Sequence, residues 1–310
     1  MKKYIVMAII LISAVLLLPR AFNSVFAGKF PADSVKEFEL TLVESGEEIT
    51  LTAEEYLVGC LFAQIDVSYE LEALKAQAVA AYTYALRLTE DGNELSDSSS
   101  MCQPFFTPAK AREYYGDSYD EYLPNVTEAA GYGASHALYY ENKPIYSVYH
   151  SVSAGVTARP EYIWGINLPY LDRVDCPVDM SYIYFRTENE MSADDMRTRL
   201  LRYDGTLEMP LDYSLWFTEI NRDESGYVRS ARVGGKTLSG GDLWRILGLR
   251  STAFDISWNG MAFTVTAMGY GHGAGMSQFT ADYLAKDGWT AEEILGYFYR
   301  GATLKTVDSG

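Results

Sequence analysis

Histidine and cysteine are scarce in this sequence, which contains three of each among its 310 residues. A structural zinc site requires several such side chains at short spacing. The polar loop that follows the second predicted helix holds Cys102 alone. We therefore expect no metal at that place, and no motif in the chain calls for a cofactor.

Basic residues are also few, with 25 Lys and Arg against 42 Asp and Glu and a net charge of −17. Residues 1–27 hold three of the basic residues and no acid, so the remainder of the chain carries a net charge of −20. An acidic surface argues against a nucleic-acid partner and against nonspecific adhesion to anionic wall polymers. An uncharged glycan backbone stays compatible with it.

Long hydrophobic runs are absent except at the N-terminus, where Lys2 and Lys3 precede an apolar stretch over residues 4–18. A small-residue site ends at Ala27. This pattern is typical of a secretory signal peptide, and the stretch is short for a spanning helix, although an uncleaved membrane anchor also fits. We therefore expect a signal peptide or anchor over 1–27, a linker over 28–35 and a domain over 36–305. The domain would lie outside the cytoplasm, membrane-anchored or secreted.

Export permits a disulfide among the three cysteines. Cys60 lies in an apolar helical stretch and is predicted to be a buried thiol. Cys102 and Cys176 lie in loop-like segments, and the sequence leaves open whether they pair.

Helices and strands are mixed without βαβ alternation and without an internal repeat, which predicts an α+β fold with mostly antiparallel strands. Capping boxes begin helices at Thr52 and Thr290, and a capping pattern begins another at Ser192. Hairpins are predicted around residues 45–46, within 215–235, and around Asn259-Gly260 with a type I′ turn. The remaining predicted elements are helices over 70–88, 110–130 and 242–249 and strands over 137–140 and 145–151.

Three stretches together resemble one known family. They are Tyr56–Gly59 with the Ala-rich segment 72–81, then Tyr149–Thr157 with Trp164-Gly165, and Gly269–Gln278 with its Gly-His-Gly core. In order and spacing they resemble the stage II sporulation protein D family, which includes the amidase-enhancer proteins. The resemblance covers about residues 52–304.

The resemblance implies a lytic transglycosylase that cuts peptidoglycan glycan strands during engulfment, after a partner amidase has removed the stem peptides. Such an enzyme uses one glutamate, first as general acid on the glycosidic oxygen and then as general base. In this chain the matching position holds Gln64, and an amide has no titratable proton. The resemblance also places Tyr82 where the family has arginine.

Asp66 is a possible substitute acid, because it follows Gln64 closely and replaces the family's proline. Glu70 and Glu72 are interpreted as ordinary acids of a helix's first turn. Two functions therefore stand: a glycan-strand binding or remodelling protein with weakened or lost cleavage, and an active lytic transglycosylase that uses Asp66.

The resemblance also implies residues that contact the glycan. These are Lys75, Gln77, Tyr82, His150, Ser153, His272 and Gln278. For the two histidines a structural role is the alternative, with His272 fixing a tight turn between glycines. A Ser/His hydrolase that uses Ser153 or Ser277 is disfavoured, because the chain has no Gly-x-Ser-x-Gly nucleophile elbow.

Overall fold

The computed structural model describes residues 36–98 and 103–307. These residues form two compact units, the first running up to Ala137 with the C-terminal residues from Lys305, and the second covering Leu138–Leu304. The predicted signal segment, the linker over 28–35 and Cys102 lie outside the described residues. Over the two described ranges, no helix is both long and apolar enough to cross a membrane.

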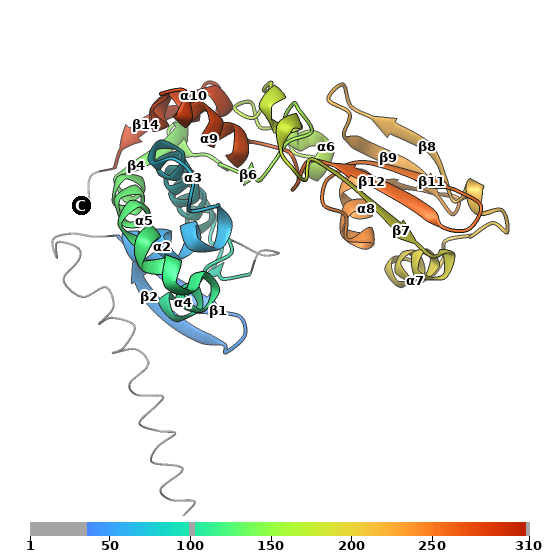
Figure 1. Ribbon diagram of the computed structural model, residues 1–310, viewed down its shortest axis with the longest axis horizontal. Coiled ribbons are helices and arrows are strands. Elements are labelled where there is room, and N and C mark those ends of the chain that lie inside the picture. The colour runs from blue at the N-terminus through green and yellow to red at the C-terminus, as the bar shows by residue number, and fades with distance from the viewer. Residues whose placement is uncertain (1–35, 99–102, 308–310) are drawn as a thin grey trace, which may run out of the picture. The chain divides into compact units, whose positions relative to one another are not determined.

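The first unit packs a small sheet against a group of helices (Figure 1). The sheet has the order β2-β1-β3, and β1 pairs with β2 in antiparallel register. Its elements are β1 (Glu37–Leu42), β2 (Glu47–Thr52), α2 (Ala53–Gln64), α3 (Leu71–Glu90), β3 (Leu95–Ser96), α4 (Pro108–Tyr115), the 3-10 turn η1 (Gly116–Ser118) and α5 (Tyr119–Ala134).

Small residues bring the helices of the first unit close together. The alanine-rich α3 packs against α5, where a Cβ added to Gly133 would lie 2.5 Å from the Cβ of Ala78. On α2, a Cβ added to Gly59 would lie 2.1 Å from the ring of Phe105. These distances are below van der Waals contact, so glycine is required at both positions.

The second unit contains small, mostly antiparallel sheets flanked by short helices (Figure 1). The sheet orders are β10-β9-β8, β11-β12-β7, β14-β4-β5 and the parallel pair β13-β6. The chain enters this unit within β4. Its elements are β4 (His136–Tyr140), β5 (Lys143–Pro144), β6 (Tyr149–His150), α6 (Pro160–Trp164), η2 (Pro177–Ser181), β7 (Arg186–Met191), α7 (Ala193–Tyr203), η3 (Tyr213–Leu215), β8 (Phe217–Arg222), β9 (Val228–Val233), β10 (Lys236–Ser239), α8 (Gly240–Leu247), β11 (Ala253–Trp258), β12 (Phe263–Met268), β13 (Met276–Ser277), α9 (Gln278–Lys286), α10 (Ala291–Phe298) and β14 (Thr303–Thr306).

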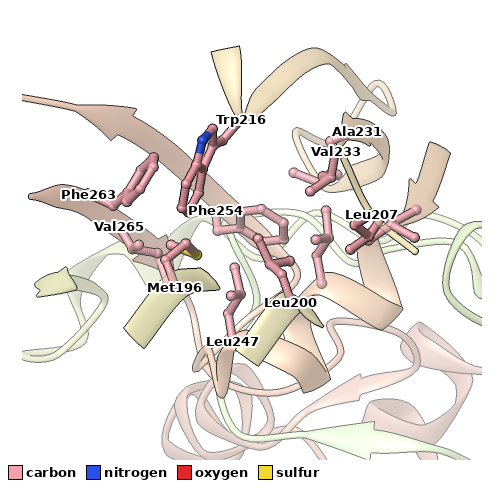
Figure 2. Packing of buried hydrophobic residues seen from close by; sticks show 14 residues of the cluster. Met196, Leu200, Leu207, Trp216, Ala231, Val233, Leu247, Phe254, Phe263 and Val265 are labelled. Carbon is pink, nitrogen blue, oxygen red and sulfur yellow. The ribbon is translucent and has the colours of Figure 1, made fainter. Parts of the chain in front are cut away.

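A hydrophobic cluster holds α7, α8 and the sheets β10-β9-β8 and β11-β12-β7 together (Figure 2). Trp216 and Phe263 pack against each other at a tilt, with ring centroids 5.2 Å apart, and Phe254 is fully buried in the same cluster. The indole N–H of Trp216 donates to the carbonyl of Pro210 at 2.8 Å, so the buried ring keeps a hydrogen-bond partner.

The α+β class and the antiparallel character of the sheets are confirmed. Capping boxes are present at Thr52 and Thr290, and Ser192 caps α7 as predicted. The helix predicted over 110–130 is broken, because Gly116 adopts a positive φ of 55° between α4 and α5.

The type I′ turn predicted at Asn259-Gly260 does not form at that place. Residues 259–262 form a four-residue loop in which only Gly260 has positive φ, and Asn259 accepts hydrogen bonds through its side chain. Positive φ at two successive residues occurs instead at Glu141 and Asn142, between β4 and β5. The strand predicted over 145–151 is reduced to β6, which pairs with the distant β13.

Candidate functional site

Gln64 is the last residue of α2, where the helix ends at an extended C-cap. Its side chain is half-buried, and its amide nitrogen donates to the carbonyl oxygen of Pro104 at 2.7 Å. A carboxyl group at this place could make that contact only in its protonated form. The position therefore suits a protonated acid, and Gln64 keeps the hydrogen bond without a proton to transfer.

Asp66 lies in the break between α2 and α3 and is exposed. Its carboxylate accepts hydrogen bonds from the backbone N–H and the hydroxyl of Ser68, at 3.0 and 2.7 Å. This is the geometry of a local turn before a helix. This exposed place differs from the desolvated environment of a catalytic acid.

Lys75 on α3 is held between two carboxylates. Its ammonium lies 3.0 Å from Glu72 and 3.1 Å from Glu128, and 5.7 Å from the ring centroid of Tyr132. Partial burial opposes its charge, but the hydrogen bonds and charges of Glu72 and Glu128 prevail and raise the pKa of Lys75. Lys75 is therefore a fixed cation on a partly exposed surface.

Gln77 and Tyr82 lie in the interior of the first unit, each with 1 % of its surface exposed. The Tyr82 ring packs edge-on against Phe38, with centroids 5.9 Å apart. Neither side chain offers surface to a sugar in this structure, so proposals of glycan contact in this unit rest on Gln64 and Lys75.

In the second unit the parallel pairing of β6 with β13 brings His150 beside His272, with ring centroids 5.8 Å apart. The ring of Trp164 packs edge-on against His272 at 4.9 Å. The Gly-His-Gly segment can follow this path because Gly271 has positive φ and approaches the backbone of residue 150 closely. The glycines of this segment therefore allow close packing between segments of the protein itself.

Hydrogen bonds fix the proton on each imidazole. Nδ1 of His150 lies 3.0 Å from the carbonyl oxygen of Ala274, so this nitrogen carries the proton. Nε2 of His150 is buried, and among the described residues it has no hydrogen-bond partner. Nδ1 of His272 accepts from the backbone N–H of Ala274 at 3.1 Å, which fits the turn-fixing role.

Both imidazoles are neutral at physiological pH. Burial, with a contribution from His272, lowers the pKa of His150 to about 3. Burial also lowers the pKa of His272 to about 4, against an opposing hydrogen bond to the backbone of Tyr149. Neither group is therefore a cation or a general acid near neutral pH.

Asp179 is a residue that the sequence did not single out. It is fully buried and accepts hydrogen bonds from the Ser153 N–H at 2.6 Å, the Ser277 hydroxyl at 2.8 Å and the Thr280 hydroxyl at 2.6 Å. Burial raises its pKa, while these hydrogen bonds act in the opposite direction. Asp179 therefore ties η2 to the segment after His150 and to the start of α9.

Ser153 and Ser277 are both fully buried, and the hydrogen bonds to Asp179 account for their place in the interior.

Cys176 is a buried free thiol nearby, and burial, followed by the charge of Asp179, raises its pKa to about 12, so it stays protonated. Cys60 is buried, as predicted. Gln278, the first residue of α9, is also buried, with 4 % of its surface exposed.

The structure thus brings two of the candidates, His150 and His272, together, with Trp164 packed against His272, and it links Ser153 to Ser277 through Asp179. Gln64, Asp66 and Lys75 belong to the other compact unit. Within the described parts of the chain, no three His, Cys, Asp or Glu side chains are placed to hold a metal ion.

Comparisons with known proteins agree with these motifs. A family described as "Stage II sporulation protein" matches residues 45–140. Stage II sporulation protein D of Bacillus subtilis is 33% identical over 277 residues, which cover 87% of this chain and 78% of that protein. Its counterpart in Bacillus amyloliquefaciens is 32% identical, over 83% of this chain and 75% of that protein. The amidase enhancer of Bacillus subtilis is 24% identical over 80% of this chain and 40% of its own length. The chain therefore belongs to the stage II sporulation protein D family.

Proposed function

We propose that this protein binds peptidoglycan glycan strands and takes part in cell-wall remodelling during engulfment in sporulation, with its lytic transglycosylase activity weakened or lost. Family membership supports the process and the substrate. The observation that carries the loss of activity is the Gln64 amide, which donates to the Pro104 carbonyl where the family has its catalytic glutamate.

The chemistry of position 64 argues against efficient cleavage. A single group must first give a proton to the glycosidic oxygen and then take one from the sugar 6-hydroxyl. Loss of general acid–base catalysis costs roughly 10² to 10⁴ in rate, and more when one group performs both steps. An amide performs neither step.

The competing function is an active enzyme that uses Asp66. Its exposure and its two hydrogen bonds to Ser68 fit a turn residue better than a catalytic acid. We therefore keep cleavage through Asp66 as an outcome of the test.

The amidase-enhancer relative supports a second part of the proposal, that a cell-wall amidase is the partner and prepares the strands. The protein would then work outside the cytoplasm, anchored through its N-terminal segment or secreted.

The direct test is co-sedimentation of the purified full-length protein with insoluble glycan strands from which an amidase has removed the stem peptides. We expect the protein to sediment with these strands and not with cellulose. Absence of binding would contradict the proposal. Release of anhydro-sugar products by the wild type, abolished in Asp66→Ala, would replace it with the active-enzyme function.

A further inference from the structure

The second unit contains an open groove, with a volume of about 860 Å³, that is lined mostly by residues outside the sequence motifs. It lies between α6, the β8–β9 hairpin and the start of α8, which are neighbours in the fold (Figure 1). The approach of α8 depends on Gly240, because an added Cβ would lie 1.7 Å from the Val228 carbonyl oxygen. The groove has the size of a site for a small ligand or a sugar unit.

The charge of the groove differs from that of the chain as a whole. Three arginines and two acids line it, in a protein whose net charge is −17. Arg222 is engaged with Asp255 and with the carbonyl of Phe254, and Arg245 pairs with Asp242 at 2.5 Å. These two arginines therefore serve contacts within the protein.

Arg229 is different. Its guanidinium lies 4.1 Å from the ring centroid of Tyr162, and within the described residues it makes no ion pair. Stacking on Tyr162 occupies one face of the guanidinium and limits its motion. The N–H groups at its edge stay available for the two oxygens of a carboxylate.

Trp164 supplies an aromatic surface in the same groove. It is the last residue of α6, it is 42 % exposed, and its edge contact with His272 fixes the ring. A fixed, exposed aromatic ring beside polar groups suits a ligand with one apolar face and hydroxyls at its rim, which describes a pyranose.

We propose that this groove binds a carboxylate-bearing amino sugar of a glycan strand, with Arg229 pairing to the carboxylate and Trp164 stacking on the sugar ring. The inference rests on the proposed function and assigns it a binding groove in the second unit. Where no stem peptide is attached, the lactyl group of muramic acid ends in a carboxylate, which is the group that Arg229 would pair with. The groove also gives an acidic protein a local means of holding an anionic strand.

The test measures the affinity of the full-length protein by titration calorimetry for three probes: soluble peptide-free strand fragments, uncharged oligomers of N-acetylglucosamine, and free stem peptide. We expect the wild type to prefer the peptide-free strands. Arg229→Gln weakens that binding roughly tenfold and leaves binding of the uncharged oligomers unchanged. The matched control is Arg232→Gln, an exposed arginine on the same strand β9 outside the groove, which leaves all affinities unchanged.

The outcomes separate the two proposals. If the wild type binds the strands and Arg229→Gln binds them equally well, the groove is not the site, while the proposed function stands. If Arg229→Gln loses affinity for the stem peptide and not for the strands, the carboxylate belongs to the peptide and the inference is overturned. If the wild type binds none of the strands, the proposed function itself fails. Equal melting temperatures of the variants exclude misfolding.

Discussion

We propose that Gln64 occupies the position of the family's glutamate, from which it would differ by one group, an amide nitrogen in place of a carboxylate oxygen. The hydrogen bond to Pro104 shows how that nitrogen is used. Because the contact needs a donor, the site stabilises an amide or a protonated acid and disfavours a carboxylate. Gln64 is thus compatible with the local structure and offers no transferable proton.

Asp179 gives a prediction about stability. Asp179→Asn replaces one acceptor oxygen by a donor, which faces either the Ser153 N–H and the Ser277 hydroxyl or the hydroxyls of Ser277 and Thr280, so we expect a loss of about 2–4 kcal/mol in the free energy of unfolding. Denaturant titration measures it. Asp212→Asn is the control, because the exposed Asp212 makes similar contacts with Ser214 and should cost less than about 1 kcal/mol. Equal losses in the two variants would contradict the role of burial.

His150, which is buried, and His272, which is partly buried, give a prediction about pH. Because their folded-state pKa values of about 3 and about 4 lie below the unfolded value, they stabilise the fold above pH ~6.5 and lose this effect as the pH falls through their folded values. We expect His272→Asn, which keeps an acceptor for the N–H of Ala274, to reduce the loss of stability between pH 6.5 and 4 by on the order of 1–2 kcal/mol. An unchanged pH profile of unfolding would speak against this account.

Sequence reasoning found the residues that belong to motifs and missed those that tertiary contacts bring together. Gln64 and His272 stood in recognisable patterns. Asp179 and Arg229 carried no local signal, because their partners lie far away along the chain. Motif membership also did not separate exposed from buried positions, as the buried Tyr82 shows.

At the scale of elements, local chemistry predicted helix starts well, because Ser and Thr caps satisfy backbone N–H groups without help from the rest of the fold. Turns were less predictable. Asn259 and Gly260 lie in a four-residue loop, whereas Glu141 and Asn142 have the two successive positive φ angles that were expected of the Asn-Gly pair. The register of the flanking strands decides the turn type.

The contact between α3 and α5 gives a prediction at this scale. Gly133→Ala adds a methyl group 2.5 Å from the Cβ of Ala78, so overpacking outweighs the gain in helix propensity and we expect a loss of about 1–3 kcal/mol. Gly131→Ala, two residues away on α5, meets its nearest atom at 3.7 Å and should be neutral or stabilise by up to about 1 kcal/mol. Thermal unfolding of the two variants compares them, and a stabilised Gly133→Ala would disprove the close packing.

At the scale of the molecule, the fold class followed from the mixture of patterns, but the division into two units did not. The boundary lies inside β4, without the change in composition that marks a linker. A strand that passes between units looks like any other strand in the sequence. For this reason the sequence patterns predicted a single domain over 36–305.

The central claim is that this member of the family binds glycan strands but lacks the proton needed to cut them. Mass spectrometry of peptide-free strands incubated with the full-length protein tests it most directly. The account predicts no anhydro-sugar products from the wild type and their appearance with Gln64→Glu. Products from the wild type, at a rate that Gln64→Glu does not increase, would contradict it.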